Sequence, residues 1–75
     1  MKIKTLKELE EFDKKAHDLL IQIWAGLSRI SEKKAKRDLK ENIGSDYEIV
    51  SDDIGIKFTN NYSGEILFYS NGDWN

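Results

Sequence analysis

The stretch TLKELEEFDKKAHDLLIQIWAGLSRI, residues 5–30, decides the fold of this chain. Thr5 and Glu8 have the spacing of a capping box, in which each side chain accepts a hydrogen bond from the other's backbone N–H, so a helix is expected to begin near Leu6. The apolar residues that follow recur at intervals of three and four: Leu9, Phe12, Ala16, Leu19, Ile23, Leu27 and Ile30. This spacing predicts one amphipathic helix over residues 6–28, with the apolar stripe against a core.

A second helix is expected at residues 32–42. Its apolar residues, among them Ala35 and Leu39, are four apart, but on a continuous helix they would lie outside the first stripe. The helix therefore has to break before them. Ser31 is a good N-cap for the new helix, and Gly44 is the kind of residue that ends one in the left-handed conformation.

Beyond Gly44 the apolar residues alternate with period two, which predicts three antiparallel strands at residues 47–50, 54–59 and 65–69. The side chains expected to face the helices are Tyr47, Ile49, Ile54, Ile56, Phe58, Ile66 and Phe68. Those expected on the opposite face are Glu48, Val50, Lys57, Thr59, Glu65, Leu67 and Tyr69. The predicted fold is α+β: a single domain over residues 1–75, in which two N-terminal helices pack on a C-terminal three-stranded antiparallel β-meander.

The composition excludes several classes of function. The chain has no cysteine, so neither disulfides nor thiol chemistry is available. No apolar stretch is long enough to cross a bilayer, and the N-terminal residues do not resemble a secretory leader, so we expect a cytoplasmic protein without a membrane partner. The net charge is −2 but is uneven: residues 1–43 hold eleven Lys and Arg against eight Asp and Glu, and residues 44–75 hold one Lys against six. The predicted sheet is the acidic half.

No residue pattern in the chain predicts an enzyme. His17, the only histidine, falls on the polar flank of the first helix, where it is expected to be solvated and without a catalytic partner. Asp52 and Asp53 are adjacent and point in different directions, and the glycines are scattered, so we expect neither a metal nor a cofactor. Helices before an antiparallel sheet are similar to the arrangement in small ribosome-dependent endoribonuclease toxins, with residues 1–4 as a leading strand. Such enzymes need cations on their strands, where this chain has only Lys57.

One candidate surface is a basic run in the second helix. Lys33, Lys36, Arg37 and Lys40 lie on the side opposite its apolar residues. This pattern makes a nucleic-acid-binding regulator the alternative function. Acidic residues flank the run and the predicted sheet is acidic, so the chain would repel a phosphate backbone at longer range, and nucleic acid is not the partner that we expect.

The other candidate surface is the outward face of the sheet, where an apolar centre with an acidic rim is typical of a protein-binding patch. Trp74, next to the last residue, either docks on the core or is exposed as a further anchor. Counting it, the residues expected to contact the partner are Glu48, Val50, Asp52, Asp53, Glu65, Leu67, Tyr69 and Trp74. We therefore expect a non-enzymatic protein-binding module, most like an inhibitor such as an antitoxin, an immunity protein or a phage-encoded anti-defence factor. Its acidic sheet face would block a protein partner with a basic groove, for example a nucleic-acid-handling enzyme.

Overall fold

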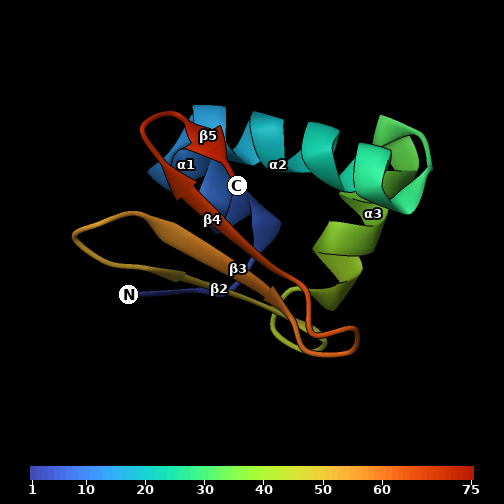
Figure 1. The fold of residues 1–75 in the computed structure, drawn as a ribbon. Coiled ribbons are helices and arrows are strands. Elements are labelled where there is room, and N and C mark those ends of the chain that lie inside the picture. The colour runs from blue at the N-terminus through green and yellow to red at the C-terminus, as the bar shows by residue number, and fades with distance from the viewer.

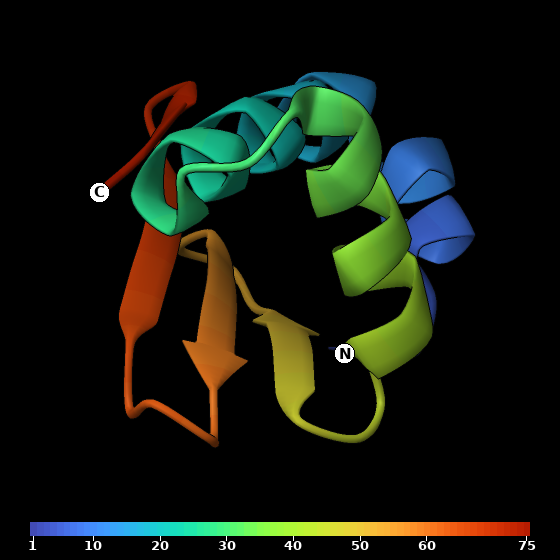
Figure 2. The ribbon, with the colours of Figure 1, turned by 90° about the vertical axis from the view of Figure 1, so that its right-hand side faces the viewer.

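The computed structural model describes all 75 residues, and it places three helices on one face of a five-stranded antiparallel sheet. The elements in chain order are β1 (Lys2–Ile3), α1 (Leu6–Phe12), α2 (Lys14–Ser28), α3 (Glu32–Asn42), β2 (Tyr47–Ser51), β3 (Ile56–Asn60), β4 (Ile66–Ser70) and β5 (Asp73–Trp74). The strands lie in the sheet in the same order as in the chain. The helices arch over one face and leave the other open (Figures 1 and 2). The predicted α+β fold is confirmed, with five strands in place of three.

The first predicted helix is two helices that meet at Asp13. The residue has an extended backbone, with φ −156°, and its side chain accepts a hydrogen bond from the Ala16 N–H at 3.0 Å. Aspartate competes well for backbone N–H groups and so favours a cap over a helix interior. The break changes which residues of the helices face the core. Phe12 and Leu27, both in the predicted apolar stripe, are half exposed, whereas Leu20, which was outside it, is fully buried.

The other helix boundaries follow the sequence. Thr5 Oγ1 accepts from the Glu8 N–H at 3.0 Å and caps α1, although the Glu8 carboxylate reaches Lys4 N instead of Thr5 N. Ser31 caps α3 by accepting from the Lys34 N–H at 3.1 Å, and the range 32–42 is as predicted. None of the three helices combines the length and the apolar character that crossing a membrane would require.

The register of β4 differs by one residue from the prediction. Ile49, Phe58 and Leu67 lie opposite one another across β2, β3 and β4, so Leu67 faces the helices. Tyr69 is buried on the same side, and Ile66 and Phe68 point outward instead of inward. The two faces of β4 are almost equally apolar, so the alternation alone does not choose between them.

The loop before β4 fixes that register. Asn60 caps the loop, because its Oδ1 accepts from the N–H groups of Tyr62 and Ser63 and its own N–H donates to the Glu65 carbonyl. The pairing of Asn60 with Glu65 places Glu65 on the helix side of the sheet. At the other turn, Ile54 lies outside β3 and is 76% exposed, contrary to its expected place in the core.

Each edge of the sheet is closed by a chain end. Ile3 pairs with Ile49, so the N-terminal residues do form a leading strand. Asn71 and Gly72 both have positive φ, as a two-residue hairpin of the type I′ kind requires, and they return the chain as β5. Trp74 is thereby carried under the helices, with 3% of its surface exposed. Of the two roles that the sequence left open for Trp74, the structure shows the docked core residue and not the exposed anchor.

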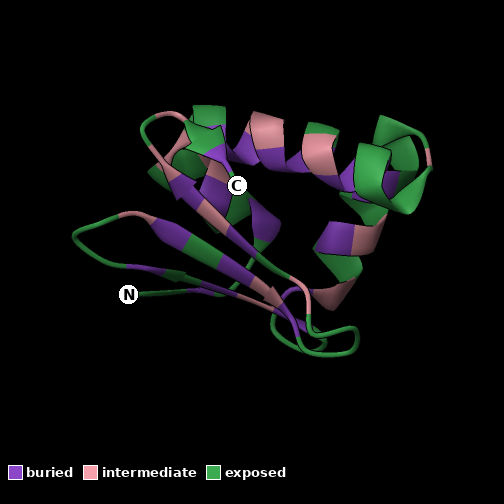
Figure 3. Ribbon diagram, in the orientation of Figure 1, coloured by how far each residue is buried: buried purple, intermediate pink, exposed green.

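One partly buried carboxylate joins the helices to the sheet. Trp24, Tyr47 and Phe58 form an aromatic cluster with ring centroids 5.2–5.4 Å apart. Asp38 Oδ2 accepts from Trp24 Nε1 at 2.8 Å and from the Tyr47 hydroxyl at 2.7 Å. These bonds join α2, α3 and β2, and the buried residues concentrate between the helices and the sheet (Figure 3).

Tyr47 makes folding sensitive to alkaline pH. Burial, together with the hydrogen bond to Asp38, raises the pKa of Tyr47 above its usual value near 10. The unfolded chain therefore loses this proton first, and we expect the free energy of unfolding to fall as pH rises above about 10. In Tyr47→Phe the slope should be smaller, although Tyr69, whose pKa is also raised, leaves part of it. Urea unfolding between pH 8 and 11 measures this.

The matched control is Tyr62→Phe. Tyr62 is 88% exposed, so removing its hydroxyl should leave the pH dependence unchanged. Equal slopes for the wild type and Tyr47→Phe would contradict the assignment to Tyr47.

Candidate functional site

The eight residues predicted to contact a partner do not form one surface. Glu48 and Val50 lie on the open face of the sheet, and Asp52 and Asp53 lie in the turn between β2 and β3. The other four lie on the helix side of the sheet, where Leu67, Tyr69 and Trp74 are buried and Glu65 is partly exposed. These four residues are not on the open face where the sequence placed them, because β4 is shifted by one residue and because β5 docks the tail.

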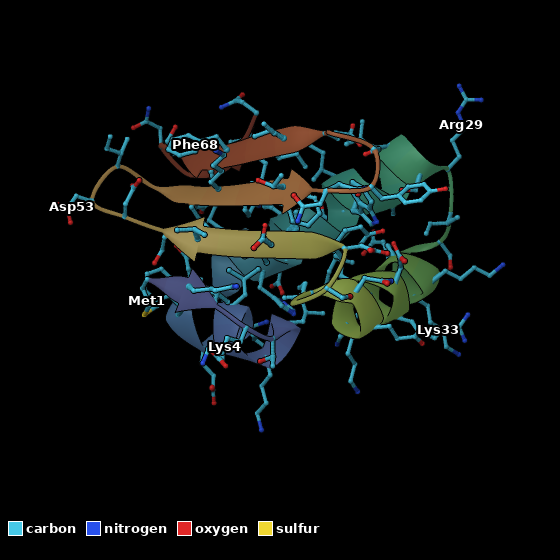
Figure 4. The ribbon with its side chains drawn as sticks, turned by 90° about the horizontal axis from the view of Figure 1, so that it is seen from below. Met1, Lys4, Arg29, Lys33, Asp53 and Phe68 are labelled. Carbon is cyan, nitrogen blue, oxygen red and sulfur yellow. The ribbon has the colours of Figure 1, made fainter.

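The open face is mixed in charge, and it is seen directly in Figure 4. One row across it contains Lys2, Val50, Lys57 and Phe68, and Glu48 stands in the next row. The carboxylate of Glu48 accepts from the Asn61 amide at 2.8 Å and lies 3.6 Å from Lys2 Nζ, and these contacts lower its pKa. Asp73, which pairs with Ser70, adds a second acid to this face beside the paired Glu48, so two lysines balance two acids and the face is not the acidic surface that the sequence predicted.

Acidic and apolar groups do come together at one end of the sheet, in a cleft of about 220 Å³. This acidic cleft lies between the junction of α1 and α2 and the turn after β2. It is lined by Phe12, Asp13, Asp52, Asp53, Ile54, Gly55, Ile56, Tyr69, Ser70 and Asn71. No lysine or arginine lines it. Asp53 projects at the tip of the turn, beside the N-terminal end of the chain (Figure 4).

The three carboxylates of the acidic cleft differ in their hydrogen bonds. Asp52 Oδ1 accepts from the N–H groups of Ile54 and Gly55 at 2.8 and 3.0 Å, which holds the turn and lowers the Asp52 pKa. Asp13 uses one oxygen to cap α2. Asp53 makes no hydrogen bond or ion pair, so its whole carboxylate is available.

Tyr69 supplies part of the lining of the acidic cleft. Its ring packs on Trp74 at 5.2 Å, and burial followed by the charges of Asp13 and Asp73 raises its pKa. Three of the predicted residues, Asp52, Asp53 and Tyr69, therefore do share one site. Phe12, Asp13 and Ile54 also line it and were not predicted, because the first two fall within the first predicted helix and the third was placed in the core.

A larger cleft of about 500 Å³ lies on the helical side of the molecule. This basic cleft is lined by Thr5, Leu6, Lys7, Glu10, His17, Lys36 and Lys40. Only Lys36 and Lys40 of the predicted basic run take part. His17 was expected on the surface, but the break at Asp13 turns it inward and only 3% of it is exposed. The one signal in the sequence for the break was Asp13 itself, a good N-cap residue between the apolar positions Phe12 and Ala16.

His17 has acidic neighbours that could suggest a metal site. The carboxylates of Glu10 and Asp18 and a ring nitrogen of His17 lie within 4.8 Å of one another. His17 Nδ1 is 2.8 Å from Asp18 Oδ1, and Lys14 Nζ is 3.1 Å from Asp18 Oδ2 and 3.9 Å from Glu10 Oε2. The His17 contact, followed by that of Lys14, lowers the pKa of Asp18. The ammonium of Lys14 thus already occupies the place where a cation would neutralise these groups.

Comparison with known proteins finds no matching family model, no similar curated protein and no similar solved structure. The function therefore has to be argued from the two clefts and the open face.

Proposed function

We propose that this protein is a non-enzymatic protein-binding module of the inhibitor type, and that the acidic cleft receives a basic, apolar segment of its partner. The observation that carries the proposal is the presence of exposed apolar side chains beside the unpaired carboxylate of Asp53. Phe12 is 50% exposed and Ile54 is 76% exposed, and both flank the cleft that contains Asp53. Apolar groups that can lose water, next to charges that can pair, are the elements of a protein interface.

The size of the acidic cleft favours a side chain as its occupant. Sites for small organic ligands usually measure about 300–1,000 Å³, so a volume of about 220 Å³ is small for a cofactor. An arginine or lysine side chain could enter beside Asp53, and its stem could lie against Ile54. A partner with a basic groove, such as a nucleic-acid-handling enzyme, would offer several such side chains and would associate quickly through electrostatic attraction.

A peptide display selection on the whole chain tests this proposal. We expect the selected peptides to combine Arg or Lys with a neighbouring large apolar residue. Asp53→Asn should slow association several-fold and weaken its salt dependence, because an exposed charge acts mainly on the encounter. Ile54→Ser should instead speed dissociation by about tenfold, because it removes apolar contact area.

The matched control is Glu48→Gln, which removes an acidic charge from the open face and should leave peptide binding unchanged. Asp52 is unsuitable for this comparison because its side chain holds the turn. Acidic peptides in the selection, or equal losses in Glu48→Gln and Asp53→Asn, would overturn the proposal. Proteins that carry the selected motif should then lose activity when one equivalent of the chain is added.

A further inference from the structure

We propose that the basic cleft binds the phosphate group of a small phosphate monoester, with an organic part of about nucleoside size. The cleft shares no residue with the acidic cleft, so this inference does not rest on the proposed function. It joins the N-terminal part of α1 to α3, with His17 of α2 between them.

The first support is a set of three cations without partners. Lys7, Lys36 and Lys40 come from two helices, and no carboxylate lies within 4.0 Å of any of their ammonium groups. The one acid in the cleft, Glu10, is directed toward Lys14 and His17. Like charges gathered around a shared space repel one another, and an anion bound between them would turn that repulsion into attraction.

The second support is independent of the lysines. His17 is 97% buried, its Nδ1 is engaged by Asp18, and its Nε2 has no hydrogen-bond partner in the protein. Nε2 is also not sealed from solvent, and the only cleft that His17 lines is the basic cleft. An ionised carboxylate can only accept, so Nδ1 carries the hydrogen and Nε2 is left to bond whatever occupies the cleft. A phosphate suits it in either state, because it can donate to the neutral ring or accept from the charged one.

The remaining lining fits a phosphate that carries an organic group. Thr5 Oγ1 accepts from Glu8 N, so its own hydroxyl hydrogen is free to be donated. Leu6 and the methylene stems of the lysines provide an apolar wall. The volume of about 500 Å³ is within the range of sites for small ligands and exceeds what inorganic phosphate needs.

Calorimetric titration of the full chain with adenosine monophosphate, phenyl phosphate, inorganic phosphate and adenosine tests the proposal. Adenosine should not bind, because charge-assisted bonds to the phosphate are needed for measurable affinity. The two monoesters should bind at least tenfold more tightly than inorganic phosphate, because only they place an organic group against Leu6 and the lysine stems. Absence of monoester binding at 10 mM ligand would overturn the proposal.

A matched pair of double variants locates the site. Lys36→Gln with Lys40→Gln should weaken monoester binding by about tenfold or more. Lys33→Gln with Arg37→Gln removes the same charge from the same helix but outside the cleft, and should change it less than threefold. Lys33 projects away from the molecule in Figure 4. All four substitutions are at exposed positions and should leave the circular dichroism melt intact.

His17 is tested by nuclear magnetic resonance as well as by mutation. Adding adenosine monophosphate should shift the Nε2 signal of His17 in the wild type. The His17→Gln variant should bind adenosine monophosphate more weakly than both the wild type and the control variant Lys33→Gln with Arg37→Gln. If His17→Gln does not fold, the wild-type shift decides the point, and an unchanged Nε2 signal at saturation would contradict the role of His17. The competing outcome is a nucleic-acid-binding face on α3. A short single-stranded oligonucleotide that binds far more tightly than the monoester, and whose affinity falls equally in both double variants, would overturn the proposal in its favour.

Discussion

Replacing Trp74 by alanine is expected to lower the free energy of unfolding by about 3–5 kcal/mol, the usual cost of deleting a buried large aromatic side chain. Trp74 is 3% exposed, its ring packs on Tyr69, and its Nε1 donates to the Ala16 carbonyl at 2.9 Å. The change would open a cavity between β5 and α2 and would leave that carbonyl without its partner. Urea unfolding followed by circular dichroism measures the loss.

Two variants bracket this result. Trp74→Phe keeps an apolar ring but loses the donor and part of the volume, so it should cost clearly less than alanine. Tyr62→Ala removes a large aromatic side chain that is exposed, and should change stability by no more than about 0.5 kcal/mol. A cost below about 1 kcal/mol for Trp74→Ala would mean that the tail does not dock as described.

Asp38→Ala is expected to lower the free energy of unfolding by about 3 kcal/mol or more. It would leave Trp24 Nε1 and the Tyr47 hydroxyl, which belong to buried residues, without the partly buried acceptor that they share, and an unsatisfied buried polar group costs about 1–3 kcal/mol. The Asn42 amide, which donates to Asp38 Oδ1 at 2.9 Å, would lose a partner too. The same unfolding experiment measures this loss.

Asp38→Asn separates the charge from the hydrogen bonds. The amide keeps one acceptor oxygen for Trp24 and Tyr47, so the loss should be smaller than in Asp38→Ala. Glu41→Ala, on the exposed side of the same helix, should be nearly neutral. If Asp38→Ala were as mild as Glu41→Ala, the carboxylate would not be joining α2, α3 and β2.

The parts of the fold that follow from neighbouring residues were predictable. The range of α3 was right because Ser31 and the residues of the first turn specify its start locally. The break at Asp13 was missed because the apolar period of α1 and α2 runs through it almost without interruption. Periodicity reports which residues could share a face, and it does not report that a single side chain has captured a backbone N–H.

The register of β4 and the place of Trp74 depend on distant contacts. Ile66 to Tyr69 are all apolar, so either face could have been buried, and Asn60 in the preceding loop decides between them. Trp74 docks on a partner, Ala16, that lies 58 residues earlier in the sequence, so the pattern of neighbouring residues does not reveal the contact. The clefts were unpredictable for the same reason. Lys7 and Lys36 line one cleft, and Phe12 and Asp53 line the other, only after the helices have packed.

The short outer strands also bear on how the chain behaves when it is concentrated. Exposed strand edges are templates for intermolecular pairing, and an uncharged, mostly apolar strand such as Ile66–Ser70 increases that hazard. In the native protein β5 occupies the free edge of that segment at Tyr69 and Ser70, and Asn75 bonds Phe68 in both directions. Displacement of the two-residue strand β5 would therefore uncover the backbone edge of β4, and variants that loosen Trp74 should aggregate more readily than the wild type when the protein is concentrated.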